Sequence, residues 1–238
     1  MFRNNYIFKC NYCDGGANAE RIGFAGGCSD TMIKHNIEIG RPWCSDLQCP
    51  CRRYAEGKIS RQELDTHNLQ DACQEGFDIC HEAKLLSVWK VLAGTNNRPG
   101  PKQGTKRTLP GVAPGHLCVL TTRLPEEDTE AQRVIFAAFI IGECDEGSKE
   151  LQGFAAAAPG LTITFNNDEA RKLRLWDYHK NPKAEDKIQW GSGLYRKCDY
   201  KEALTLLDAM IEAKETAEGK AQVQKMKEAF LQNLVIID

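Results

Sequence analysis

Apolar residues in the second half of the chain follow the pattern of β-strands. Short apolar runs predict strands at residues 117–123 and 134–143, and the second is apolar on both faces, as in a central strand. Two further strands are predicted at residues 154–158 and 161–165, because the turn signal Pro159-Gly160 separates them. The segment 190–195, WGSGLY, follows as a glycine-rich aromatic stretch. We therefore expect a small β-barrel over residues 116–200.

Helical periodicity occurs on both sides of this segment. Ser60 and Glu63 have the spacing of a capping box, which predicts a helix to about residue 73. Residues 79–93 place apolar side chains at helical intervals, and Gly94 would end that helix. Asn166 or Asn167 is predicted to cap a helix that runs to about residue 178. Residues 201–238 predict two helices broken at Gly219, with apolar stripes that pack on the domain itself.

Composition divides the chain into four parts. Residues 94–115 contain nine Gly or Pro residues among 22, and their charged residues are all basic, which predicts a flexible linker. The resulting division is a cysteine-rich metal-binding module with two helices (1–93), the linker (94–115), the barrel (116–200) and the C-terminal helices (201–238). The fold class is therefore predicted to be α+β.

The overall balance of residues is typical of a soluble globular protein. Hydrophobic residues make up 42% of the 238 residues, charged residues 27%, and the formal net charge is −2. These values exclude global disorder. No apolar run reaches the length of a membrane-spanning helix, and the N-terminus has no signal-peptide pattern. The sequence thus predicts a cytoplasmic protein without a membrane partner.

Cysteine is far more frequent than in an ordinary intracellular protein. The chain has 11 cysteines, and eight of them lie within the first 80 residues. In a reducing compartment this pattern favours thiolate ligands over disulfides. We favour zinc, because small loop-rich modules often need it to fold, and an iron–sulfur cluster is the alternative. The candidate ligands, of which the sequence does not select four, are Cys10, Cys13, Cys28, Cys44, Cys49, Cys51 and Cys80.

No established catalytic motif is present, and the remaining chemical signal is aromatic. HExxH, GxSxG, Walker and strand-linked GxGxxG patterns are missing from the sequence. Four large aromatic residues instead fall within 20 positions, and such side chains can stack on a nucleic-acid base. Polar side chains at the end of the first strand and basic linker residues could add hydrogen bonds and phosphate contacts. The predicted nucleic-acid-binding residues are Trp176, Trp190, Tyr178, Tyr195, Arg123, Thr122, Lys102, Lys106 and Arg107.

The layout of residues 116–200 resembles the PUA superfamily of small β-barrels, which includes the EVE, YTH and SRA domains. The resemblance rests on the opening strand HLCVLTTR, the central strand VIFAAFIIGECDEG, a further strand pair, a capped helix and an aromatic segment. Members of this superfamily often hold a flipped, modified base between aromatic residues, and here Trp176 and Trp190 would be these walls. A cysteine module before such a barrel is similar to the sensor parts of modification-dependent restriction systems.

We therefore expect a protein that recognises a modified base in nucleic acid, most simply DNA, as a sensor in a defence or restriction system. Its expected partner besides nucleic acid is an effector nuclease or a second copy of the chain. Two alternatives stay open at this stage. One is an iron–sulfur or zinc enzyme with redox or hydrolytic chemistry, and the other is a protein-interaction adaptor that uses the C-terminal helices.

Overall fold

The chain forms two compact units. The computed structural model describes residues 4–16, 23–67, 80–96, 100–125, 127, 129–181, 187–191 and 193–235. The first unit, here called the sheet unit, comprises Met1–Cys10 and Trp89–Asp238. The second, here called the cysteine unit, comprises Asn11–Val88. The first ten residues of the chain thus belong to the same unit as its C-terminal half.

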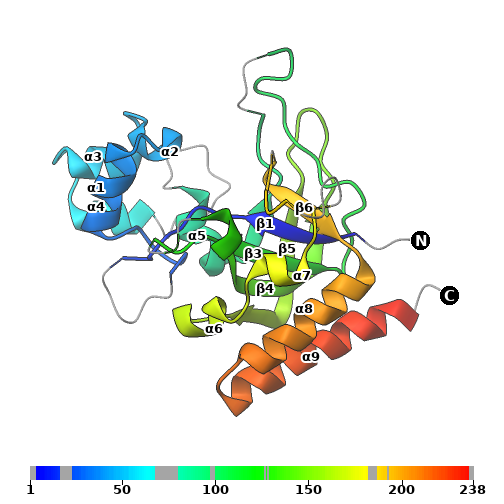
Figure 1. Cartoon of the computed structure of the whole chain (residues 1–238). Coiled ribbons are helices and arrows are strands. Elements are labelled where there is room, and N and C mark those ends of the chain that lie inside the picture. Colours follow the sequence, from blue (N-terminus) through cyan, green and yellow to red (C-terminus); the bar gives the residue numbers. More distant parts are fainter. Residues whose placement is uncertain are drawn as a thin grey trace. The chain divides into compact units, whose positions relative to one another are not determined.

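The sheet unit is built on a six-stranded, curled sheet with the order β2-β5-β4-β3-β1-β6 (Figure 1). Strand β1 lies inside the sheet, parallel to β3 and antiparallel to β6, and the other neighbours are antiparallel. The strands are β1 (Asn5–Lys9), β2 (Lys90–Leu92), β3 (Leu117–Thr122), β4 (Val134–Asp145), β5 (Phe154–Thr164) and β6 (Tyr195–Cys198).

Irregular pairing along β4 gives the sheet its curl. The register shifts between Leu120 and Thr121 on β3, and twice along β4 between Phe139 and Glu143. Bulges of this kind bend a strand and increase its twist. Gly142 lies in the bent region, where a Cβ atom would be 2.6 Å from the Cα of Ala158. The close approach of β4 and β5 at this point therefore requires glycine.

Helices cover the sheet and complete its core. Helices α6 (Asn167–Arg171) and α7 (Leu175–Tyr178) follow β5, and the 3-10 turn η1 (Glu130–Gln132) precedes β4. The C-terminal helices α8 (Tyr200–Ala213) and α9 (Ala217–Val235) pack on each other, and α9 packs against β4 and β5. Their fully buried side chains include Leu207, Val223, Met226 and Phe230. The apolar stripes thus face the unit itself, as the sequence predicts.

The cysteine unit consists of short helices joined by loops. Its described helices are α1 (Asp30–Glu38), α2 (Pro42–Ser45), α3 (Pro50–Ala55), α4 (Arg61–His67) and α5 (His81–Val88). Ser29 caps α1 by accepting from the backbone N–H of Met32. Ser60 and Glu63 form the predicted reciprocal capping box at the start of α4. Among the described residues of this unit, few large apolar side chains are buried, and buried cysteines supply part of the core.

The α+β class is confirmed, but five local predictions are wrong. The helix predicted from Asn166 or Asn167 to about residue 178 is instead two short helices, α6 and α7, interrupted at residues 172–174. Residues 154–164 form one strand and not two, because Pro159-Gly160 sits opposite the bend of β4. The helix predicted over 79–93 ends at Val88, since Trp89 has a φ of 45° and the chain then enters β2. Gly219 lies within the first turn of α9. The cysteine unit has five described helices where two were expected.

The predicted linker is also wrong. Residues 94–115 belong to the sheet unit, and Leu109 within them is fully buried. Thr95 and Lys106 form an isolated β-bridge, and the N–H of Leu109 donates to the carbonyl of Glu146 at 2.8 Å. The described residues of this segment, 94–96 and 100–115, therefore form a loop held by hydrogen bonds to the rest of the sheet unit. Within the described part of the chain, no helix combines the length and apolar character needed to cross a membrane.

Candidate functional site: indoles and guanidinium groups in the sheet unit

Two tryptophans form the centre of the candidate site. Trp176 lies on α7 and is partly exposed, whereas Trp190 precedes β6 and is only 3% exposed. Their ring centroids are 6.5 Å apart with an interplanar angle of 79°, so an edge of one ring meets the face of the other. The Nε1–H of Trp190 donates to the carbonyl of Gly193 at 2.9 Å. The indoles are therefore not the parallel walls that were expected, and of the two only Trp176 has accessible surface.

Two arginines stack on these rings. The Cζ atom of Arg196, on β6, lies 5.5 Å from the ring centroid of Trp176 and 5.4 Å from that of Trp190. Arg133 lies over Trp190 at 5.0 Å. Arg133 is buried and binds the carboxylate of Glu130 through Nε at 2.6 Å and Nη2 at 3.1 Å. Such stacking places positive charge on the negative faces of the indoles.

Arg196 differs from Arg133 in its charge balance. Its Nη2 donates to the carbonyls of Gln189 and Trp190, and no ion pair joins it to a carboxylate in the described part of the chain. Burial lowers the pKa of Arg196, and Glu130 opposes this effect. A guanidinium group held only by neutral acceptors keeps its capacity to attract an anionic or electron-rich ligand.

Three buried polar atoms around the indoles have no hydrogen-bond partner among the described residues. They are Nε1 of Trp176, Nε of Arg196 and Nε2 of His179. The His179 ring lies 5.9 Å from the Trp176 ring, and its Nδ1 pairs with Glu202. Buried polar atoms are rarely left unpaired in proteins, so their concentration here makes this cluster the candidate site.

A surface hollow of about 480 Å³ adjoins this cluster. Gly193, which accepts from Trp190, is one of its lining residues. Tyr195 also lines it, and its hydroxyl donates to the carbonyl of Thr108 at 2.8 Å. The basic side chains in the hollow are Lys106 and Arg107, and neither has an ion pair in the described residues. The full lining is Asn96, Lys106, Arg107, Thr108, Gly193, Leu194 and Tyr195.

The structure brings together five of the nine predicted nucleic-acid residues, at the indoles or in the hollow: Trp176, Trp190, Tyr195, Lys106 and Arg107. Tyr178 lies on α7, partly exposed, and burial raises its pKa. Lys102 is exposed but does not line the hollow. Thr122 is fully buried and its hydroxyl donates to the carbonyl of Cys10 at 3.2 Å, so it is a structural residue. Arg123 follows β3 and is partly exposed.

Two residues of the cluster were not predicted. Arg133 directly precedes β4, and Arg196 is the second residue of β6. Neither belongs to a known motif, and the ring contacts of Arg133 with Trp190 and of Arg196 with Trp176 join segments that are distant in the sequence. One local signal could have drawn attention to Arg196. It directly follows Tyr195, the last residue of the aromatic segment 190–195.

The predicted metal ligands divide between the two units. Cys10 belongs to the sheet unit, where its charge acts on Cys118. The other six lie in the cysteine unit, in which the Sγ of Cys28 donates to the Sγ of Cys13 at 3.7 Å. This hydrogen bond lowers the pKa of Cys13, against the effect of burial. A hydrogen bond from Cys51 likewise lowers the pKa of Cys49 to about 7.

No ready-made metal site is seen, since the described residues contain no group of three or more His, Cys, Asp or Glu side chains arranged to hold an ion. Comparison with known proteins adds nothing to this picture: no family model matches the chain, and neither a curated protein nor a solved structure matches it. The resemblance to the PUA superfamily and both cofactor hypotheses thus stay predictions.

Proposed function

We propose that the sheet unit binds DNA and holds one extruded, modified base against Trp176. The observation that carries this proposal is the cluster of indole and guanidinium groups with unpaired polar atoms beside a basic hollow. In this proposal the chain is a sensor that acts with an effector nuclease or with a second copy of itself.

The base would stack on the accessible side of Trp176 and not between two indoles. The edge-to-face contact of Trp176 and Trp190 leaves no parallel gap for a base. Arg196 covers both rings, and its Nε–H and the Nε1–H of Trp176 are buried without a partner among the described residues, so a ligand must displace neighbouring atoms to reach them. Both groups are hydrogen-bond donors. The ligand edge is therefore expected to carry acceptors, such as carbonyl oxygens or ring nitrogens.

Stacking on one indole does not suffice for base extrusion. Extruding a base costs a few kcal/mol, and stacking on an aromatic ring returns about 1–3 kcal/mol. The rest must come from edge hydrogen bonds and from phosphate contacts. Lys106 and Arg107 lie where they could supply the latter, because their hollow shares Gly193 with the Trp190 turn.

Trp176→Ala should weaken DNA binding without unfolding the sheet unit. Loss of one stacking surface predicts an affinity about 5- to 150-fold lower. The melting temperature should change little, since Trp176 is partly exposed. The measurement is fluorescence anisotropy with short labelled duplexes that contain one 5-methylcytosine, one N6-methyladenine or only unmodified bases.

The matched control is Ile188→Ala, which removes a side chain that is 54% exposed and lies in the connection between α7 and β6. It should leave affinity unchanged. Arg196→Lys keeps the positive charge but removes Nε, so it should reduce discrimination among the duplexes more than it reduces overall affinity. Equal affinity of Trp176→Ala and the wild type, or no binding of any duplex at low salt, would contradict the proposal.

The basic hollow predicts a specific salt dependence. Replacing Lys106 and Arg107 by Gln should lower the slope of log K against log salt by about 0.9 per lost phosphate contact on duplex DNA. Lys102→Gln removes the same charge from an exposed position outside the hollow and should change the slope less. An identical slope in the wild type and the double variant would show that the hollow is not part of the DNA-binding surface.

A further inference from the structure

The basic hollow of the sheet unit lies between two segments that are far apart in the sequence. One is the loop between β2 and β3, and the other is the turn that leads into β6. The loop is fixed in place by its backbone, because the N–H of Arg107 donates to the carbonyl of Gly94 at 2.9 Å. The hydroxyl of Tyr195 donates to the carbonyl of Thr108 at 2.8 Å and joins the two segments. The walls of the hollow are therefore held together by the fold itself.

The charge in this hollow is not balanced. Lys106 and Arg107 both line it, and the described lining residues include no acidic side chain. Neither cation has an ion pair or a side-chain hydrogen bond among the described residues, and Nε of Arg107 is buried without a partner. Two positive charges thus lie at one hollow without a counter-charge from the described part of the chain.

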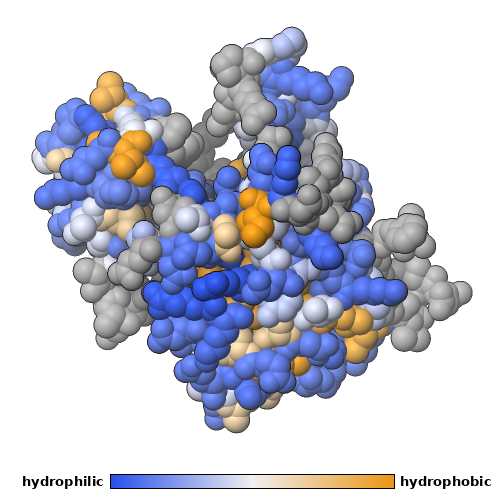
Figure 2. Space-filling model, in the orientation of Figure 1, coloured by the Kyte–Doolittle hydropathy of each residue, from blue (hydrophilic) through white to orange (hydrophobic). Residues whose placement is uncertain are grey.

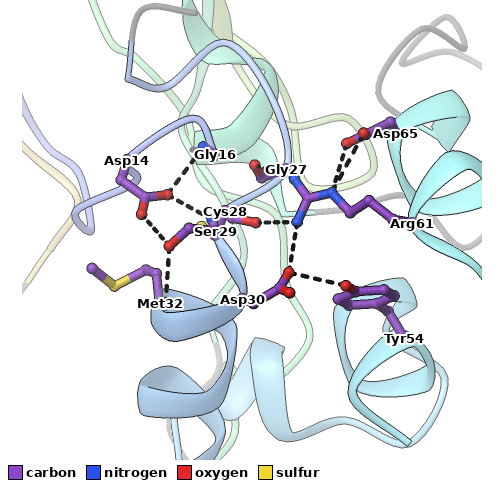
Figure 3. A network of polar contacts seen from close by, with 10 residues as sticks. All are labelled: Asp14, Gly16, Gly27, Cys28, Ser29, Asp30, Met32, Tyr54, Arg61 and Asp65. Carbon is purple, nitrogen blue, oxygen red and sulfur yellow. Dashed lines mark hydrogen bonds and ion pairs between the residues drawn. The ribbon is translucent and has the colours of Figure 1, made fainter. Parts of the chain in front are cut away.

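Arg61 of the cysteine unit shows the contrasting case, an arginine whose binding capacity is used (Figure 3). It donates to the carbonyl of Cys28 at 2.8 Å and to that of Gly27 at 3.2 Å. It also pairs with Asp30 and with Asp65, each at 3.3 Å. A guanidinium group has five N–H donors, and those of Arg107 are engaged by no other described residue. They are therefore available to an anion.

Two unpaired cations side by side favour an anion with a double charge. A phosphate monoester carries about −1.5 to −2 charges at neutral pH and has three strong acceptor oxygens. Arginine binds phosphate through two parallel hydrogen bonds, and lysine adds a point charge. A phosphodiester, as in the interior of a DNA strand, has only one negative charge. The hollow is therefore better matched to a terminal phosphate than to a backbone phosphate.

The size and the remaining walls of the hollow indicate a ligand larger than phosphate alone. Its volume of about 480 Å³ lies within the range of about 300–1,000 Å³ that is usual for small-molecule sites. Leu194 is 39% exposed and offers apolar surface beside the cations. Thr108, which is also exposed, offers a hydroxyl group. A matching ligand has a dianionic end and a neutral body with both apolar and polar surface.

We propose that the hollow binds a nucleotide through its terminal phosphate monoester, with Arg107 and Lys106 at the phosphate and Leu194 against the nucleoside. A nucleoside has the required neutral body, because its base has apolar faces and its edges and sugar are polar. The nucleotide is a free molecule or the end of a strand, since both carry the same monoester. This site goes beyond the proposed DNA binding, in which the hollow meets only internal phosphates, and it does not require Trp176.

Isothermal titration calorimetry of the full chain at low salt tests the chemistry of the ligand. Adenosine monophosphate should bind about 10-fold or more tightly than cyclic adenosine monophosphate, which has the same base and sugar but a diester. Adenosine, without phosphate, should give no measurable binding, and ribose 5-phosphate, without the base, should bind more weakly. Equal affinity for the monoester and the cyclic diester, or for the nucleotide and inorganic phosphate, would overturn the proposal.

Substitutions test the residues. Arg107→Gln and Lys106→Gln should each weaken the binding of adenosine monophosphate about 10-fold or more. Lys102→Gln is the matched control, because it removes the same charge from an exposed position outside the hollow and should not change the affinity. Trp176→Ala should also bind the nucleotide normally, so this site and the base pocket can fail separately. Unchanged affinity in both hollow variants would assign the nucleotide to another place.

Melting temperatures measured beside the titrations separate binding from folding. Since the Arg107 guanidinium has no partner among the described residues, Arg107→Gln should fold like the wild type. If it does not, Lys106→Gln decides, because Lys106 is exposed.

Competition with single-stranded oligonucleotides separates the two sources of the monoester. One oligonucleotide carries a 5′-phosphate, and the other has the same sequence with a 5′-hydroxyl. Displacement of bound nucleotide by the phosphorylated strand alone would extend the site to strand ends, and displacement by neither would assign it to free nucleotides. Equal displacement by both strands would contradict selection of the monoester and overturn the proposal.

Discussion

Phe230→Ala should lower the free energy of unfolding of the sheet unit by about 3–5 kcal/mol, the usual cost of removing a fully buried aromatic side chain. Phe230 lies on α9 with no exposed surface, and its ring stacks on Tyr200 of α8 with a centroid distance of 5.4 Å. Chemical denaturation monitored by circular dichroism measures the change. Because α9 also packs on β4 and β5, the whole unit should lose stability in one transition.

The neighbouring residue provides the control. Leu231 is 36% exposed, so Leu231→Ala should change the free energy of unfolding by less than about 1 kcal/mol. This pair of variants also addresses the adaptor alternative, in which the C-terminal helices offer their apolar stripe to a partner protein. Similar small effects of both variants would mean that the stripe is not needed for the core. On the face drawn in Figure 2, hydrophilic residues predominate.

Glu169→Gln should destabilise the sheet unit by about 2–3 kcal/mol at neutral pH, since it removes a buried charge-assisted network. The Glu169 carboxylate accepts from Nζ of Lys214 at 2.7 Å, from the N–H of Glu215 at 3.2 Å and from the N–H of Asn166 at 3.1 Å. Its side chain is only 4% exposed. Glutamine keeps the shape of the side chain but loses its charge. Its NH2 group would also face hydrogen-bond donors that have no need of a further donor.

The effect of Glu169→Gln should depend on pH. Burial acts to raise the pKa of Glu169, but the hydrogen bonds from Lys214, Glu215 and Asn166 more than offset it and lower the pKa from its ordinary value of 4.5. A carboxyl group with a lowered pKa in the folded state stabilises the fold above its unfolded pKa, and this stabilisation is lost as the pH falls through the folded value. Wild type and variant should therefore converge in stability once the pH has fallen below the lowered pKa of Glu169.

Asp168→Asn is the control for this prediction. Asp168 precedes Glu169 on α6, but its side chain is 81% exposed and pairs with Arg171 at the surface. Its substitution should leave both the stability at neutral pH and its pH dependence nearly unchanged. A constant difference between the wild type and Glu169→Gln from pH 7 to pH 3 would show that the carboxylate charge does not stabilise the fold.

Features that depend on residues close in sequence could be predicted. The capping boxes of Ser60 with Glu63 and of Asn166 with Glu169 are both formed, because their hydrogen bonds join residues three positions apart. The strands at residues 117–122 and 134–145 follow from uninterrupted runs of β-forming apolar residues. The aromatic content of the candidate site was also evident, since Trp176 and Trp190 lie on one connected segment.

Tertiary structure alone decided which distant segments meet. Strand β1 lies between β3 and β6 because Tyr6 pairs with Cys118 and Lys197, and no local pattern specifies a parallel neighbour so far along the chain. Cys10 follows this strand within the sheet unit, whereas Cys13 belongs to the cysteine unit, although the two have a CxxC spacing in the sequence. Cys13 finds its partner in Cys28, and Arg196 reaches both indoles, only once the chain has folded. The spacing of residues along the chain determines helix caps and strands. The residues that form a binding site are determined instead by packing between segments that are far apart in the sequence.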